Sequence, residues 1–290
     1  MIDKIDKAVY EYLASDINLA ARLTHYADCP AIFYQEAPPD TDPLWADAPQ
    51  YSRLVFSIDT LGDATRVMGG NLAIDVQCIP GRQSPEELES VVRHLMDGCF
   101  FSSDTETIAA QWTDSRAFTD PTDQVCGITL SFSLLAFPVL TTEQPNVIAR
   151  MNQWTAEHFP YLSVINHNNQ TGTWKPNDNA YAIYWRVLSV RPANWISDSW
   201  QTVWRTALIR GHIFTAHINT SAALAHEIIC YLYQEKRLLQ SGETPIMVNQ
   251  NNQADSSADA LHMGQLTIEA TFAQIIRPKP APTLQNIHYV

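Results

Sequence analysis

Apolar and polar positions alternate most clearly between residues 70 and 79, where the pattern predicts a β-strand. The apolar positions of this strand are Leu72, Ile74 and Val76. A turn follows, and Ser84 is a good helix cap directly before Pro85, which suits the first helical position. Apolar residues then recur at helical spacing over residues 86–95, so the stretch reads as a strand followed by a helix.

The same strand-then-helix pattern recurs in the second half of the chain. Residues 211–218 are predicted as a strand that begins at Gly211, just as Gly70 begins the first one, and residues 222–235 as the following helix. The two glycines are 141 residues apart, about half of the 290-residue chain. We therefore expect two copies of one structural unit.

The remaining periodicity predicts the other elements of each copy. Further helices are expected at 3–26 and 147–158. Further strands are expected at 31–34, 51–58, 109–112, 125–138, 161–165, 181–188, 242–248 and 261–276. Polar stretches are predicted as loops at 36–49, 99–106, 114–124, 166–179 and 249–259. This order predicts an α+β fold with two tandem copies of an antiparallel β-sheet packed by helices on one face.

The repeat places one domain at residues 1–142, a second at 143–278 and an extended C-terminal arm at 279–290. The arm is rich in proline and has apolar side chains with no local fold in which to bury them. Tails of this kind either fray or lie on a neighbouring subunit. We therefore expect subunit-interface residues in the arm and among the tryptophans of the second domain. The candidates are Leu284, Ile287, Tyr289, Trp195 and Trp200.

The charge of the chain, −13 in total, is unevenly distributed. Residues 1–143 contain 8 Lys and Arg against 22 Asp and Glu, whereas residues 144–290 contain 10 against 9. The first half is therefore expected to repel nucleic acid. A difference this large between two repeats suggests that they face different neighbours.

Sequence patterns of catalytic and ligand-binding sites are missing. The chain has no phosphate-binding loop, no nucleophile elbow and no H-E-x-x-H motif. Its five cysteines form no C-x-x-C pair, which argues against a zinc ribbon and favours buried free thiols. We expect no catalytic residue, no cofactor and no metal.

Two further features bear on location. No apolar run reaches the length of about 18 residues that a transmembrane helix needs. Residues 1–7 lack the basic start and apolar core of a signal peptide. We expect no membrane partner, and a protein that stays in the cytoplasm in which it is made.

Each half of the chain resembles the tail terminator, or tail completion, proteins of long-tailed bacteriophages. The first half carries the resemblance over about residues 5–138, and residues 145–278 look like a diverged copy. The matching features are a helix ending near Leu23, the strand at 32–33, the Ala37-Pro38 loop, the sequence YSRLVF at 51–56, the strand at 70–79, the helix at 85–96 and the closing strand at 128–137.

The resemblance implies a structural virion protein rather than an enzyme. Members of this family are single domains that form hexameric rings at the head-proximal end of the tail tube. The expected function is to end tube growth and to join the tail to the head. The expected partners are further copies of the chain, the tail tube protein and head–tail connector proteins. The protein would be made in the host cytoplasm and incorporated in the virion.

Two domains in one chain depart from the family pattern, so the stoichiometry stays open. Three chains would give a six-domain ring, and six chains would place one domain in the ring and the other outside it. DNA is expected to pass through the ring without specific binding, along acids of the first domain. The candidate channel-facing acids are Asp59, Asp63, Asp114, Asp120 and Asp123. Two alternatives remain: a tube or baseplate adaptor of the same fold, and a small cytoplasmic enzyme with a site between the repeats.

Overall fold

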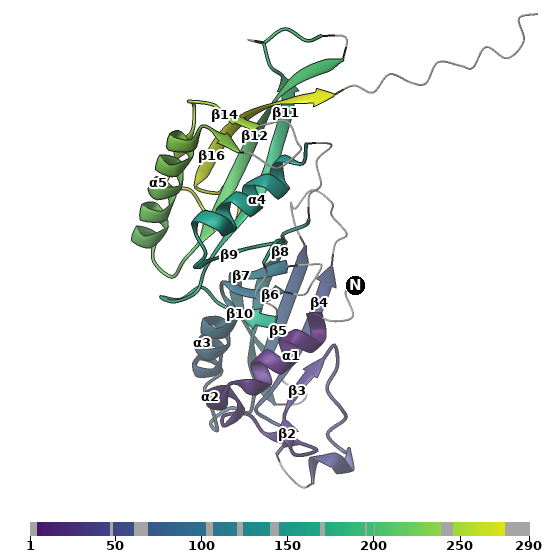
Figure 1. Ribbon diagram of the computed structural model, residues 1–290. Coiled ribbons are helices and arrows are strands. Elements are labelled where there is room, and N and C mark those ends of the chain that lie inside the picture. The colour runs from purple at the N-terminus through teal and green to yellow at the C-terminus, as the bar shows by residue number, and fades with distance from the viewer. Residues whose placement is uncertain are drawn as a thin grey trace, which may run out of the picture. The chain divides into compact units, whose positions relative to one another are not determined.

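The computed structural model (Figure 1) divides into two compact units. It describes residues 5–46, 49–60, 69–102, 107–120, 124–139, 145–168, 172–194, 196–199, 201–238 and 246–275. Unit 1 comprises Met1–Val139 and Asn168–Ala180, and unit 2 comprises Leu140–His167 and Tyr181–Val290. One segment of the second half therefore belongs to unit 1. The predicted boundary between residues 142 and 143 and the C-terminal arm lie outside the described residues.

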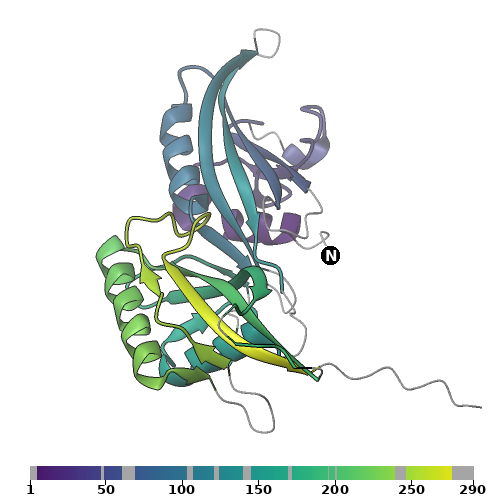
Figure 2. The ribbon, with the colours of Figure 1, turned by 90° about the horizontal axis from the view of Figure 1, so that it is seen from above.

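Unit 1 is built on a seven-stranded sheet in the order β10-β6-β7-β8-β5-β4-β3 within the described part of the chain. Its strands are β3 (Ile32–Tyr34), β4 (Arg53–Thr60), β5 (Gly70–Cys78), β6 (Cys99–Ser102), β7 (Thr107–Asp120), β8 (Val125–Ala136) and β10 (Gly172–Trp174). Neighbours are antiparallel except β3 and β4, which are parallel. A short ribbon of β1 (His25–Tyr26) and β2 (Cys29–Pro30) precedes β3. Figure 2 shows β7 and β8 as long strands that curve side by side.

The helices of unit 1 pack on one face of this sheet. They are α1 (Ile5–Ser15), α2 (Ile17–Ala20) and α3 (Pro85–Met96), and a 3-10 turn, η2 (Pro43–Trp45), lies between β3 and β4. One core joins the apolar stripes of α1 and α3 to every second residue of β5. Its central members are Val9, Leu13, Leu72, Ile74, Val76, Leu88 and Val92, all buried. Because strand side chains alternate between faces, the intervening polar residues of β5 point away from the helices.

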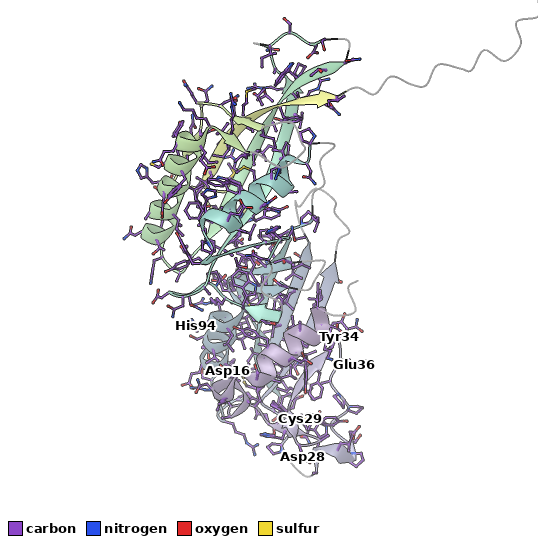
Figure 3. All side chains as sticks on the ribbon, viewed as in Figure 1. Asp16, Asp28, Cys29, Tyr34, Glu36 and His94 are labelled. Atoms are coloured by element: carbon purple, nitrogen blue, oxygen red, sulfur yellow. The ribbon has the colours of Figure 1, made fainter. Side chains whose placement is uncertain are left out.

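The N-terminal helix predicted over residues 3–26 is wrong in its length. Asp16, labelled in Figure 3, has an extended backbone between α1 and α2, and its carboxylate accepts a hydrogen bond from the Leu19 amide at 2.8 Å. A short acidic side chain that bonds nearby main-chain amides favours a helix cap over a helix interior. The apolar stripe continues through Leu19 and Leu23, both buried, which is why the pattern alone suggested one helix.

Two predicted loops of unit 1 are strands. Residues 99–102 form β6, and β7 extends through Asp120, although 99–106 and 114–124 were predicted as loops. The register of β7 against β8 shifts between Trp112 and Asp114, as a β-bulge requires. The bulge reverses the alternation, and the exposed polar residues beyond it resemble loop sequence.

Unit 2 has a sheet in the order β13-β14-β16-β12-β11-β9, with β15 beside β16, again within the described residues. Its elements are α4 (Val147–His158), β9 (Leu162–Val164), β11 (Tyr181–Pro192), β12 (Thr202–Phe214), α5 (Ile218–Glu235), β13 (Arg237–Leu238), β14 (Ile246–Val248), β15 (Gln253–Ala254) and β16 (Leu266–Ile275). The strand β15 lies in the predicted loop 249–259. The predicted helix 147–158 is confirmed, and the Asn146 side chain caps it by accepting from the Ala149 amide at 3.0 Å. Both helices share one core with the sheet.

The two units have the same topology. In each, a helix precedes a first strand that runs parallel to the second, a hairpin follows, and a second helix leads to further strands, which are β6, β7 and β8 in unit 1 and β13, β14, β15 and β16 in unit 2. The last of these strands is β8 in unit 1 and β16 in unit 2. In both sheets it lies between the hairpin and the first two strands after the second helix. The predicted fold class, two tandem α+β units with helices on one sheet face, is confirmed.

The glycines that indicated the repeat are not equivalent. Gly70 is the first residue of β5, whereas Gly211 lies near the end of β12, three residues before Phe214. Gly211 has a different role, because a side chain there would meet the Trp185 ring, whose Cζ3 lies 2.4 Å from the position of an added Cβ. The repeat was therefore predicted correctly, although the two glycines that were used to align its copies do not occupy equivalent positions.

The cysteines of the chain differ in burial. All five are free, with Cys78 and Cys99 buried and Cys29, which Figure 3 labels, exposed. Burial raises the pKa of the Cys99 thiol to about 12, so this thiol stays protonated and unreactive at pH 8. In the native protein we expect a colorimetric thiol reagent to modify Cys29 within minutes and Cys78 and Cys99 only after unfolding. A Cys29→Ser variant is the control, and rapid native modification of Cys99 would contradict the described core.

Candidate functional site

The sheet of unit 1 has a charged face opposite its helices. Pairing across β4, β5, β8 and β7 sets Asp59 beside Asn71, and Asp114 beside Ser131. The charged residues of this face are Asp59, Asp75, Asp114, Asp120, Arg53 and Arg116. We call this set the acidic face, since four carboxylates share it with two arginines.

Some of these charges are held by neighbours on the same face. The Thr129 hydroxyl donates to the Asp75 carboxylate at 2.6 Å, and Arg116 Nε lies 2.8 Å from Asp114 Oδ2. A hydrogen bond from Ser131 and the nearby Arg116 hold the pKa of Asp114 below its ordinary value. Asp59 and Asp120 are exposed and add negative charge near either end of the face.

The structure thus places three of the predicted channel acids on the same face. Asp59, Asp114 and Asp120 lie on one face of one sheet, although 61 residues of sequence separate the first from the last. Asp63 and Asp123 lie outside the described residues. All five predicted interface residues also lie outside them: Leu284, Ile287, Tyr289, Trp195 and Trp200.

The corresponding face of unit 2 has the opposite charge balance. Pairing of β11 with β12 sets Arg186 opposite Arg210 and Arg191 opposite Thr206, and β16 adds Glu269 beside Leu208. We call Arg186, Arg191, Arg210 and Glu269, with the polar residues between them, the basic face. Three arginines and one carboxylate make it net positive, in contrast to the acidic face.

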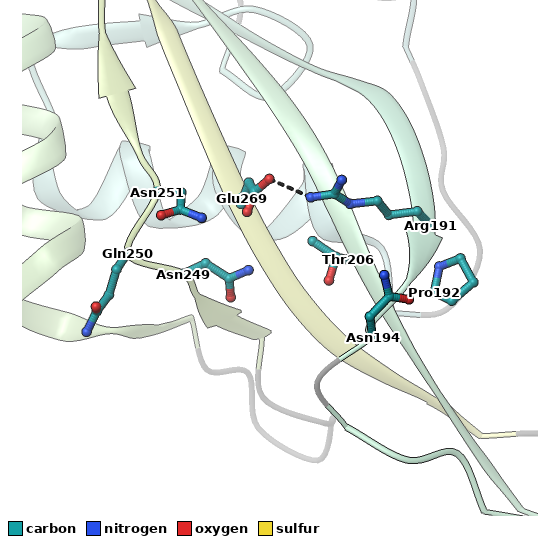
Figure 4. A pocket seen from close by; sticks show the side chains of 8 residues that line it. All are labelled: Arg191, Pro192, Asn194, Thr206, Asn249, Gln250, Asn251 and Glu269. Atoms are coloured by element: carbon teal, nitrogen blue, oxygen red, sulfur yellow. Dashed lines mark hydrogen bonds and ion pairs between the residues drawn. The ribbon is translucent and has the colours of Figure 1, made fainter.

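A polar pocket of about 660 Å³ opens on the basic face (Figure 4). Its lining residues are Arg191, Pro192, Asn194, Thr206, Asn249, Gln250, Asn251 and Glu269. Arg191 Nη2 donates to Glu269 Oε1 at 2.7 Å across the floor of this pocket. The loop after β14 supplies the amide side chains on the other side.

Hydrogen bonds within the sheet occupy most of these polar groups. Thr271 donates to Asn249 Oδ1 at 3.1 Å and lies 3.0 Å from the Thr206 hydroxyl, which therefore donates to it. Asn252 accepts from the Glu269 amide at 3.0 Å and fixes the loop against β16. The side chains that line the pocket are mainly hydrogen-bond donors and acceptors, with Arg191 and Glu269 as its charged groups.

Among the residues that the structure describes, no three His, Cys, Asp or Glu side chains gather so as to hold a metal ion. None of the described helices has the length and apolar character needed to cross a membrane.

Sequence reasoning missed the three arginines of the basic face. The alternation of buried and less buried positions could have indicated two of them. Arg186 directly follows the buried Trp185, and Arg210 directly follows the buried Ile209. Which residues lie opposite each other, however, is set by the pairing of β11 with β12, and spacing along the chain does not reveal that pairing. Arg191 is displaced onto the same face by the register shift between Val187 and Ser189.

No protein-family model matches this chain, and no match to a curated protein or to a solved structure was found.

Proposed function

We propose that this protein is a structural component of a phage virion. In this proposal it forms a ring at the head-proximal end of the tail, ends growth of the tail tube and joins the tail to the head, and it is not an enzyme. The observation that carries the proposal is the repetition of one strand order in two consecutive units. Units that repeat one fold present related surfaces at each step, which favours closed cyclic assembly.

The way in which β10 extends the sheet of unit 1 supports assembly through sheet edges. The strand β10, from the second half of the sequence, extends the sheet of unit 1 beside β6. The strand at the matching end of the sheet in unit 2 is β13, and no strand among the described residues pairs with its outer edge. An edge of this kind presents unpaired main-chain groups to which a strand of another chain can be added, here a strand of a second copy.

The acidic face supports a conduit for DNA. Asp59, Asp114 and Asp120 share this face, and carboxylates repel the phosphates of DNA. A channel lined by such a face would let DNA pass without specific binding. The partners in this proposal are other copies of the chain, the tail tube protein and the head–tail connector proteins.

Mass measurement of the purified protein tests the ring. We expect native mass spectrometry to give three or six times the 32.6-kDa chain mass, and negative-stain electron microscopy to show closed rings. Arg237→Asp at the β13 edge should shift the population toward smaller species, while Arg82→Asp in the turn before α3 serves as a charge-matched control. A monomer mass at every concentration, without rings in the images, would contradict the proposal.

A further inference from the structure

Two arginines of the basic face lie directly opposite each other. Arg186 of β11 and Arg210 of β12 are cross-strand partners, and like charges in this position repel. The next strands continue the row with Thr267 and Gln253, which also carry hydrogen-bond donors. No residue of this row is an acid.

Neither arginine has an ion-pair partner among the described residues. Glu269, the acid of the same face, pairs with Arg191. Asp255 is close enough for Arg210 to contribute to lowering its pKa, but hydrogen bonds from Ser257 are the larger cause. The Asp255 carboxylate accepts from the Ser257 amide at 3.0 Å and from the Ser257 hydroxyl at 2.6 Å.

Arg186 is held in place while part of its guanidinium stays available. His212 Nδ1 lies 2.7 Å from the Ala260 carbonyl and must therefore carry a proton, which leaves its Nε2 to accept from Arg186 Nε at 3.1 Å. Arg186 Nη2 donates to the His262 carbonyl at 3.2 Å. The described residues offer no acceptor to its third nitrogen, Nη1.

Arg210 shows the stronger sign of a missing ligand. Its Nε is buried and has no hydrogen-bond partner among the described residues. Buried donors in native proteins are nearly always satisfied by protein, water or a ligand. An unpaired donor beside a second, unpaired positive charge calls for an anion with several acceptor atoms.

We propose that Arg186 and Arg210 form an oxyanion site for a phosphate group on the basic face of unit 2. Arginine forks match the oxygen geometry of phosphate and bind it through paired, charge-assisted hydrogen bonds. Thr267 and Gln253 extend the same row of donors. The phosphate would come from the free anion or from the backbone of a nucleic acid, which offers the same oxygens. The site stands on this geometry and does not depend on ring formation.

Calorimetric titration of the full chain with sodium phosphate, at constant ionic strength set with sodium chloride, tests the site. We expect saturable binding that Arg210→Gln weakens by roughly tenfold or more, since a charge-assisted hydrogen bond is lost. Arg191→Gln, on the same face but paired with Glu269, should bind phosphate about as well as the wild type. Circular dichroism checks each fold, and Arg210→Lys, which keeps the charge but loses the fork, replaces Arg210→Gln if that variant unfolds.

A second titration, with a short DNA duplex followed by fluorescence anisotropy, separates the two sources. DNA binding that phosphate competes away and that Arg210→Gln weakens would assign the site to backbone phosphates. Phosphate binding without DNA binding would assign it to the free anion. Absence of saturable binding to both, or equal phosphate binding by the wild type and Arg210→Gln, would overturn the proposal.

Discussion

Gly211→Ala is expected to destabilise unit 2 by about 3 kcal/mol, the upper part of the usual range for overpacked cores. An added Cβ would lie 2.4 Å from Cζ3 of Trp185, well inside van der Waals contact. The ring cannot easily move aside, because Trp185 is only 1% exposed and its Nε1 donates to Thr155 Oγ1 of α4 at 2.9 Å. Thr155 in turn donates to the Met151 carbonyl at 2.7 Å, so the helix holds the ring.

Urea unfolding followed by circular dichroism measures this effect. The matched control is a double-mutant cycle with Trp185→Leu, which removes the ring that the new methyl group would meet. In that background Gly211→Ala should lower the free energy of unfolding by less than about 1 kcal/mol, so the effects of the two substitutions should be strongly non-additive. A small cost of Gly211→Ala in the wild-type background would show that Trp185 has another place to lie.

Regular alternation made much of the fold predictable. In β5 and β8 buried and less buried positions alternate for most of the strand, and in α4 the helix bounds were evident in the sequence. Each of these elements is specified by its own residues. The β7 strand was not, because its bulge after Trp112 reverses the alternation and its far half is largely exposed.

The candidate site was less predictable for a related reason. That Asp59 and Asp114 share a face depends on β5 and β8 lying between them, and that Arg186 faces Arg210 depends on hairpin register. A shift of one residue in either register would send these side chains to the opposite face. The sequence indicates the charges, but only strand pairing brings them together.

The strand β10 was the least predictable element. Substitutions in it test how the second half of the chain supports unit 1. Residues 166–179 are polar and were predicted as a loop, yet Trp174 stacks on Phe100 with ring centroids 4.3 Å apart. Its Nε1 donates to Ser102 Oγ at 3.1 Å, and Lys175 Nζ donates to the His94 carbonyl in the last turn of α3 at 2.7 Å. A cation at a helix C-terminus is favourable, so this short segment makes contacts well beyond its three ladder pairs.

We expect Trp174→Ala to destabilise unit 1 by about 2 kcal/mol, since a half-buried stacked aromatic ring is lost. Loss of this anchor should release β10 and leave β6 as an edge strand, because β10 is its partner on that side. Hydrogen exchange measured by mass spectrometry should then be faster in peptides covering 99–102 and unchanged in α5 of unit 2. Trp204→Ala, on the basic face of unit 2, is the control and should leave the exchange of β6 unaltered. Unchanged exchange of β6 in Trp174→Ala would mean that the ladder pairs alone hold β10, and the aromatic stack would then contribute little to joining the second half of the chain to unit 1.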